Sequence, residues 1–117
     1  MIRSTLSMVA VFAVVLLLLP LSAPAQITTG TVTGRVIDAT GAVVPGASVI
    51  LVSEARGLKT APVFTNPTGD YVFPNVVADT YTVEVTAQGF KVTRRTGIMV
   101  TGGDRVGVPP LTTTMYP

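Results

Sequence analysis

The side chains of this sequence that could act as acids, bases or nucleophiles are almost all carboxylates. The sequence contains no His and no Cys, so it offers no imidazole base, no thiolate nucleophile and no zinc or haem site ligated by those residues. Two carboxylates could act as general acid and base only if they converged in one cleft. Five of the six acidic residues fall at or beside expected turns, and the sixth lies on the polar face of an expected strand. We therefore predict no catalytic residue and a protein that is not an enzyme; the six residues are Asp38, Glu54, Asp70, Asp79, Glu84 and Asp104.

Two further groups of residues could do chemistry, and simpler structural roles account for both. Oxygen-bearing side chains crowd at residues 66–70, but their spacing does not match an EF-hand calcium loop, and an Asx turn explains them. Ser48 follows Gly46, but the second Gly of a nucleophile elbow is missing and no His is present to activate the hydroxyl. We expect no metal and no cofactor.

Tyrosines are the remaining candidates, because sugar-binding sandwiches stack pyranose rings on exposed aromatic side chains. The sequence has no Trp, so the candidate ligand contacts are Tyr71, Tyr81 and Tyr116. The first two occupy strand positions that also suit a core residue with its hydroxyl at the rim. Ligand contact and core packing both remain open for them.

The first 25 residues differ from the rest of the chain. Arg3 is their only charge, an unbroken apolar run covers residues 8–19, and Pro20 follows it. This run is shorter than the 18 to 20 or so residues that span a membrane. Ala23 and Ala25 have the spacing of a signal-peptidase site. We predict a helical signal peptide over residues 1–25 and an exported protein, with an uncleaved membrane anchor as the alternative.

Beyond residue 25 the composition indicates a sheet protein. This part contains 16 Val and 17 Thr, whose β-branched side chains fit a pleated sheet and are stiff in a helix. We expect seven strands, over residues 31–38, 47–52, 58–65, 71–73, 81–87, 91–100 and 105–111. The expected turn residues are Gly41, Pro45, Gly46, Asn66, Gly69 and Gly89.

Prolines and charges change what we expect of four of these strands. Pro62 removes a ladder donor and favours an edge position for residues 58–65, and Pro74 is expected to end the strand at 71–73. Pro109 and Pro110 remove two donors from the last strand, which we expect to be frayed or at an edge. Lys91, Arg94 and Arg95 form a small basic cluster near Arg105, which cannot be one flat patch because Arg94 and Arg95 point to opposite faces of a strand. We expect these charges to protect an exposed strand against edge pairing.

Several spaced motifs resemble the carboxypeptidase regulatory-like domain. They read Gly34-x-Val36-x-Asp38-x-x-Gly41-x-x-Val44-Pro45-Gly46-Ala47-x-Val49-x-Leu51, then Thr65-Asn66-x-x-Gly69-x-Tyr71-x-Phe73, then Tyr81-x-Val83-x-Val85, then Gly89-Phe90. The resemblance implies an all-β fold, a seven-stranded Greek-key β-sandwich of the transthyretin-like or carbohydrate-binding-like type. Asp79 stands where the family often has Gly.

Together with the leader, this pattern resembles the amino-terminal extension of TonB-dependent outer-membrane receptors of Gram-negative bacteria, in which a β-sandwich precedes a plug and a barrel. The expected organisation is a signal peptide (1–25), a short linker (26–30), the sandwich (31–112) and a tail (113–117), either free-standing or as a truncated relative of such a receptor. The resemblance implies a non-catalytic accessory or scaffolding module in the periplasm, at the outer membrane or secreted, with cell-envelope proteins as partners. A small carbohydrate-binding module with a polysaccharide partner is the alternative. A net charge of only +2 argues against nucleic acid, and a membrane is expected only through the leader or a receptor context.

Overall fold

The computed structural model describes residues 28–117. The predicted signal peptide, its cleavage residues Ala23 and Ala25 and the first part of the predicted linker lie outside these residues. From residue 28 onward no helix has the length and apolar character needed to cross a membrane.

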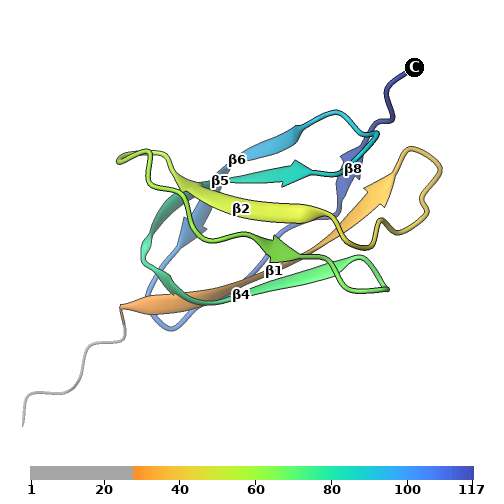
Figure 1. Ribbon diagram of the computed structural model, residues 1–117. Coiled ribbons are helices and arrows are strands. Elements are labelled where there is room, and N and C mark those ends of the chain that lie inside the picture. The colour runs from red at the N-terminus through yellow and green to blue at the C-terminus, as the bar shows by residue number, and fades with distance from the viewer. Residues whose placement is uncertain (1–27) are drawn as a thin grey trace, which may run out of the picture.

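Within residues 28–117, eight strands form two sheets that pack face to face (Figure 1). One sheet has the order β4-β1-β7, with β8 also paired to β1, and the other has the order β3-β2-β5-β6. The strands are β1 (Thr29–Asp38), β2 (Ser48–Ser53), β3 (Val63–Phe64), β4 (Asp70–Val77), β5 (Asp79–Thr86), β6 (Thr93–Val100), β7 (Arg105–Gly107) and β8 (Leu111–Thr113). The predicted all-β sandwich is confirmed.

Neighbouring strands are mostly distant in the sequence. β1 pairs antiparallel with β4 and parallel with both β7 and β8, while β2 pairs antiparallel with β5. The chain therefore crosses repeatedly from one sheet to the other, as Greek-key connections do. Because β1 lies between β4 and β7, side chains from three remote segments share each face of the first sheet.

The core lies between the two sheets and is built by alternation. Val32 and Val36 of β1 and Val83 and Val85 of β5 are fully buried, each with an exposed fraction of 0%. The intervening residues point away from the core, as the two-residue period of a strand requires. The predicted inward face of residues 81–87 is thus confirmed at Tyr81, Val83 and Val85.

The prediction that Pro74 ends its strand is wrong, because β4 continues to Val77. The register with β1 shifts here: Gly30 faces Val76 and Val32 faces Phe73, so Pro74 and Asn75 together oppose one residue. Asn75 has a φ of 56°, which this bulge accommodates. β4 lies at the edge of its sheet, and a bulge on an edge strand is where a missing N–H is tolerated.

Two other strand predictions need correction. The segment 58–65 forms only the short edge strand β3, since Pro62 cannot donate to a ladder and the residues before it are mostly exposed. The expected last strand is divided into β7 and β8 by Pro109 and Pro110, which explains eight strands instead of seven. The chain also stays ordered past residue 112: Thr113 belongs to β8, and Met115 forms a bridge with Phe90.

Candidate functional site

The acidic side chains are engaged in local contacts within turns and between strands. Asp38 Oδ1 accepts hydrogen bonds from the Thr40 hydroxyl (2.6 Å) and the Ala42 amide (3.0 Å), and the bond from the Thr40 side chain lowers the pKa of Asp38. Asp79 Oδ2 accepts from Ser53 Oγ (2.7 Å) and Arg56 Nη2 (3.0 Å), and these contacts, that of Ser53 foremost, lower its pKa. Across residues 28–117 no three acidic side chains are grouped so that they could hold a metal ion.

The remaining acidic groups also hold strands and turns together. Glu54 Oε1 accepts from the Gly97 amide (2.7 Å), and Glu84 Oε2 pairs with Arg94 Nε (2.9 Å) across neighbouring strands. Asp104 accepts from the Thr101 hydroxyl in the turn that leads into β7. Every carboxylate of the described region is thus tied to a hydroxyl, an amide or a guanidinium group.

The turn at residues 66–70 has the geometry of an Asx turn. Asn66 Oδ1 accepts from the amides of Thr68 (3.0 Å) and Asp70 (2.9 Å). Gly69 has a φ of 78°, and a Cβ there would lie 2.8 Å from the Val36 carbonyl oxygen, so both backbone shape and space require glycine. Among the other turn residues, Gly41, Gly46 and Gly89 have positive φ, and Pro45 precedes Gly46 in its turn.

Two of the three candidate tyrosines lie in the core. Tyr71 is 2% exposed and Tyr81 is 5% exposed, so neither ring has a free face on which a sugar could stack. Tyr81 Oη donates to the Val77 carbonyl (2.7 Å), as buried phenols commonly do. Tyr116 is 61% exposed and its amide donates to the Gly89 carbonyl (3.0 Å). The burial of Tyr71 and Tyr81 favours core packing over sugar stacking, and the ligand-contact hypothesis stays a prediction.

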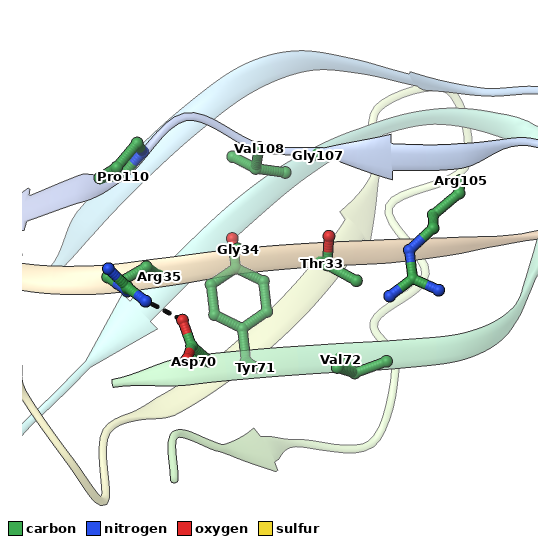
Figure 2. Close-up of a pocket in the computed structure, with 10 residues that line it drawn as sticks. All are labelled: Thr33, Gly34, Arg35, Asp70, Tyr71, Val72, Arg105, Gly107, Val108 and Pro110. Atoms are coloured by element: carbon green, nitrogen blue, oxygen red, sulfur yellow. Dashed lines mark hydrogen bonds and ion pairs between the residues drawn. The ribbon is translucent and has the colours of Figure 1, made fainter. Parts of the chain in front are cut away.

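A groove of about 380 Å³ lies on the outer face of the β4-β1-β7 sheet (Figure 2). Val32, Val36, Tyr71 and Phe73 point into the core, so the residues between them project from the opposite face. The register places Arg35 beside Asp70, and Thr33 between Val72 and Gly107. The full lining is Thr33, Gly34, Arg35, Asp70, Tyr71, Val72, Arg105, Gly107, Val108 and Pro110.

Two arginines dominate the charge of this groove. Arg35 Nε contacts Asp70 Oδ1 at 2.9 Å, and this hydrogen bond, with a second from Thr68, lowers the pKa of Asp70 while it raises that of Arg35. Arg105 is exposed and forms no ion pair within residues 28–117. In Figure 2 its side chain reaches from β7 across β1 beside Thr33. The groove therefore carries one positive charge that the described residues do not neutralise.

A family model for the carboxypeptidase regulatory-like domain matches residues 31–114. This chain belongs to that family. The predicted resemblance is confirmed over nearly the whole sandwich, and the matched region extends two residues past the boundary expected at 112. Among curated proteins, none is similar enough in sequence to count as a relative.

Solved structures share the sandwich of this carboxypeptidase regulatory-like domain. A chain of the type II cohesin-X-dockerin complex from Acetivibrio cellulolyticus matches with a TM-score of 0.59 and 20% identity, over 74% of this chain and 58% of that one. A putative carbohydrate binding protein from Bacteroides uniformis matches at 0.55 and 19%, over 71% and 41%. A minor pilin from Streptococcus agalactiae matches at 0.59 and 14%, over 79% and 47%.

These similarities show the fold alone. The chain spans about two-fifths to three-fifths of the length of the three structures. At identities of 20% or less, the similarity does not carry the binding partners of those proteins over to this chain.

Sequence reasoning missed the groove of this regulatory-like domain. It placed Arg105 near a basic cluster of Lys91, Arg94 and Arg95, whereas the structure brings Arg105 to the same sheet face as Arg35. The alternation of Thr33 and Arg35 with buried Val residues already indicated a polar face on β1. The partner strands of that face depend on the parallel β1–β7 pairing, which local spacing does not reveal.

Proposed function

We propose that this domain is a non-catalytic interaction module that acts by surface contact. The observation that carries the proposal is the dispersal of its carboxylates, each of which is held in a turn or between strands in the described region. General acid and base catalysis needs two such groups free to act at one cleft, whereas here each Asp and Glu side chain is engaged by a neighbouring hydroxyl, amide or guanidinium group. A regular sheet face with a charged groove, in contrast, is a surface to which another molecule can bind.

We further propose that the module is exported and works in the cell envelope, as an accessory or scaffolding domain related to the amino-terminal extension of TonB-dependent receptors. Its support is the leader pattern, with one positive charge, an apolar run and Ala23 and Ala25 at cleavage spacing. Membership of a family described as regulatory-like supports an accessory role for the domain. Cell-envelope proteins are the proposed partners.

Carbohydrate binding is the second candidate, and Tyr116 is the observation in its favour. Tyr116 is 61% exposed, and the preceding residue, Met115, is 62% exposed. A polysaccharide could stack on such a ring. The candidate now depends on this one tyrosine, since Tyr71 and Tyr81 lie in the core.

Export is tested by producing the protein from its full sequence in a Gram-negative host and sequencing the amino terminus of the periplasmic form. The expected result is a mature chain that begins at Gln26, and a precursor that accumulates when Ala25 is replaced by a bulky residue. A mature-size product found only in the cytoplasm would contradict export.

Surface contact is tested with a photo-crosslinking amino acid placed at Val72 on one sheet or at Phe64 on the other, which are 47% and 63% exposed. A discrete crosslink to an envelope protein from either position supports the interaction module. Crosslinks from neither position, together with retention on a polysaccharide that Tyr116→Ala abolishes, would replace the proposal with the carbohydrate-binding alternative.

A further inference from the structure

We infer that the groove on the outer face of the β4-β1-β7 sheet binds an extended acidic segment of a partner protein, with Arg105 receiving an Asp or Glu carboxylate. This inference rests on the proposed interaction function and names the surface and the chemistry of the partner. Three observations carry it: the glycine at the floor of the groove, the unpaired arginine at its side and the kind of side chains between them.

Gly107 keeps the floor open without any structural need for glycine. Its φ is not positive, and a Cβ built there would meet nothing within 4 Å. Glycine weakens a strand because it packs no side chain and loses more backbone entropy on folding. At Gly34 the opposite holds, since a Cβ would overlap the Tyr71 ring. The absent side chain of Gly107 therefore serves the groove and not the fold, and it lets a backbone approach Thr33.

Arg105 supplies the charge that selects the partner. Arg35 is engaged by Asp70 at 2.9 Å, whereas Arg105 forms no ion pair with any residue from 28 to 117. A guanidinium group presents parallel N–H donors that fit both oxygens of a carboxylate. The groove is thus complementary to an acidic side chain, and Asp70 at the far end disfavours a second one there.

The side chains between the charges favour a peptide over a sugar. Thr33 brings a hydroxyl and Val72, which is 47% exposed, brings an apolar surface, and the two are cross-strand neighbours. The aromatic residue in the lining, Tyr71, is buried and offers no ring face for stacking. A polar and an apolar contact side by side suit the alternating side chains of an extended chain.

The test is a titration of protein produced from the full sequence, followed by fluorescence anisotropy. The probe is a fluorescein-labelled peptide of Thr, Ser and Val with a single central Glu, and a peptide with Gln in place of that Glu is its neutral counterpart. We expect the Glu peptide to bind and the Gln peptide to bind about tenfold more weakly, because a bond to a charged group is lost. Arg105→Gln and Gly107→Leu are each expected to weaken the Glu peptide about tenfold.

Lys59→Gln is the matched control, because it removes the same charge from an exposed residue beside β2, in the other sheet. It is expected to change the affinity less than about twofold. Equal losses in Arg105→Gln and Lys59→Gln would show unspecific charge attraction and overturn the inference. Unchanged affinity in a folded Gly107→Leu variant would do the same. If that variant does not fold, Gly107→Ala and then Gly107→Ser test the role of the open floor in binding, because a Cβ at this position has open space.

The crosslinking experiment separates the two proposals. A crosslink from Val72 that Arg105→Gln abolishes supports the groove as the contact surface. A crosslink from Phe64 alone, with no binding of the Glu peptide, overturns the groove and leaves the interaction module standing. Binding of polygalacturonate, a carboxylated polysaccharide, without binding of the Glu peptide would show that the partner class is wrong.

Discussion

The ring of Tyr71 on β4 occupies the space that a side chain at Gly34 on β1 would need. The two residues are direct cross-strand partners, and a Cβ at Gly34 would overlap the hydroxyl end of the ring. Tyr71 also packs edge-on against Phe73, with ring centroids 6.0 Å apart. The contact between Tyr71 and Gly34 joins the edge strand β4 to its neighbour β1 (Figure 2).

Gly34→Ala is therefore expected to destabilise the protein by about 1 to 3 kcal/mol, because the methyl group forces the Tyr71 ring out of its position. Gly107→Ala, on the outer face of the same sheet, is the control and should change the free energy of unfolding by less than about 0.5 kcal/mol. Urea denaturation measures both. Equal effects of the two substitutions would show that the ring can move without cost.

Tyr71→Phe is expected to leave stability at neutral pH unchanged or higher. Within residues 28–117 the buried Tyr71 hydroxyl has no hydrogen-bond partner, and an unpaired buried polar group costs free energy. Tyr81→Phe is the control: it loses the bond to the Val77 carbonyl and should cost about 1 kcal/mol. Thermal unfolding of the two variants distinguishes the roles, and a lower melting temperature for Tyr71→Phe would contradict this account.

The same hydroxyl predicts a loss of stability in alkali. Burial raises the pKa of Tyr71 to about 12, against about 10 in an unfolded chain. The unfolded state thus releases its proton first, so this group leaves stability independent of pH below about 10 and lowers it as the pH rises from about 10 towards 12. Tyr71→Phe should reduce the slope of stability against pH in this range. An unchanged slope would show that Tyr71 does not titrate in this way.

Thr65→Val should cost about 1 to 3 kcal/mol. The buried Thr65 hydroxyl donates to the Val44 carbonyl (2.6 Å) and accepts from the Ala47 amide (2.8 Å), which fixes the turn at Pro45 and Gly46. Valine has nearly the same shape but leaves both backbone groups without this partner. Thr65→Ser keeps the hydroxyl and is expected to recover a large part of the loss in denaturant unfolding. A Thr65→Val variant as stable as the parent would refute the role of the hydroxyl.

Stability is expected to be flat between pH about 5 and 8 and to fall in acid. The sequence has no His to titrate near neutrality, and contacts with Thr40, Arg35 and Ser53 lower the pKa of Asp38, Asp70 and Asp79 respectively. Their contribution is complete above the unfolded value of about 3.9 and is lost as the pH falls through the lowered folded values. In Asp79→Asn the melting temperature should fall less steeply in acid than in the parent protein. An equally steep fall would show that Asp79 does not contribute to the acid sensitivity.

Val85→Ala is expected to cost about 1 to 3 kcal/mol, since the side chain is fully buried on the inner face of β5. Val72→Ala removes the same two methyl groups from a half-exposed position on β4 and should cost clearly less. Chemical denaturation of the pair checks the facing of both strands. Similar losses would mean that Val72 is covered by something in solution.

The sequence by itself determined the fold class, the family and the inner faces of the regular strands. Val83 and Val85 could be assigned to the core because alternation is a local property, and Asn66 and Gly69 marked a turn through their own side-chain chemistry. Strand ends were harder, because Pro74 is tolerated only through a bulge on an edge strand, and edge position is a property of the whole sheet.

Only the tertiary structure decided which remote segments share a surface. The position of Tyr71 over Gly34, and with it the burial of a candidate ligand contact, depends on the register of β4 against β1. The presence of Arg35 and Arg105 in one groove depends on the parallel pairing of β1 with β7, about 70 residues away along the chain. The spacing of residues along one strand shows which side chains that strand can bury. A site on a sheet face is formed by pairing between remote strands, and the free energy that stabilises this pairing comes from the whole core.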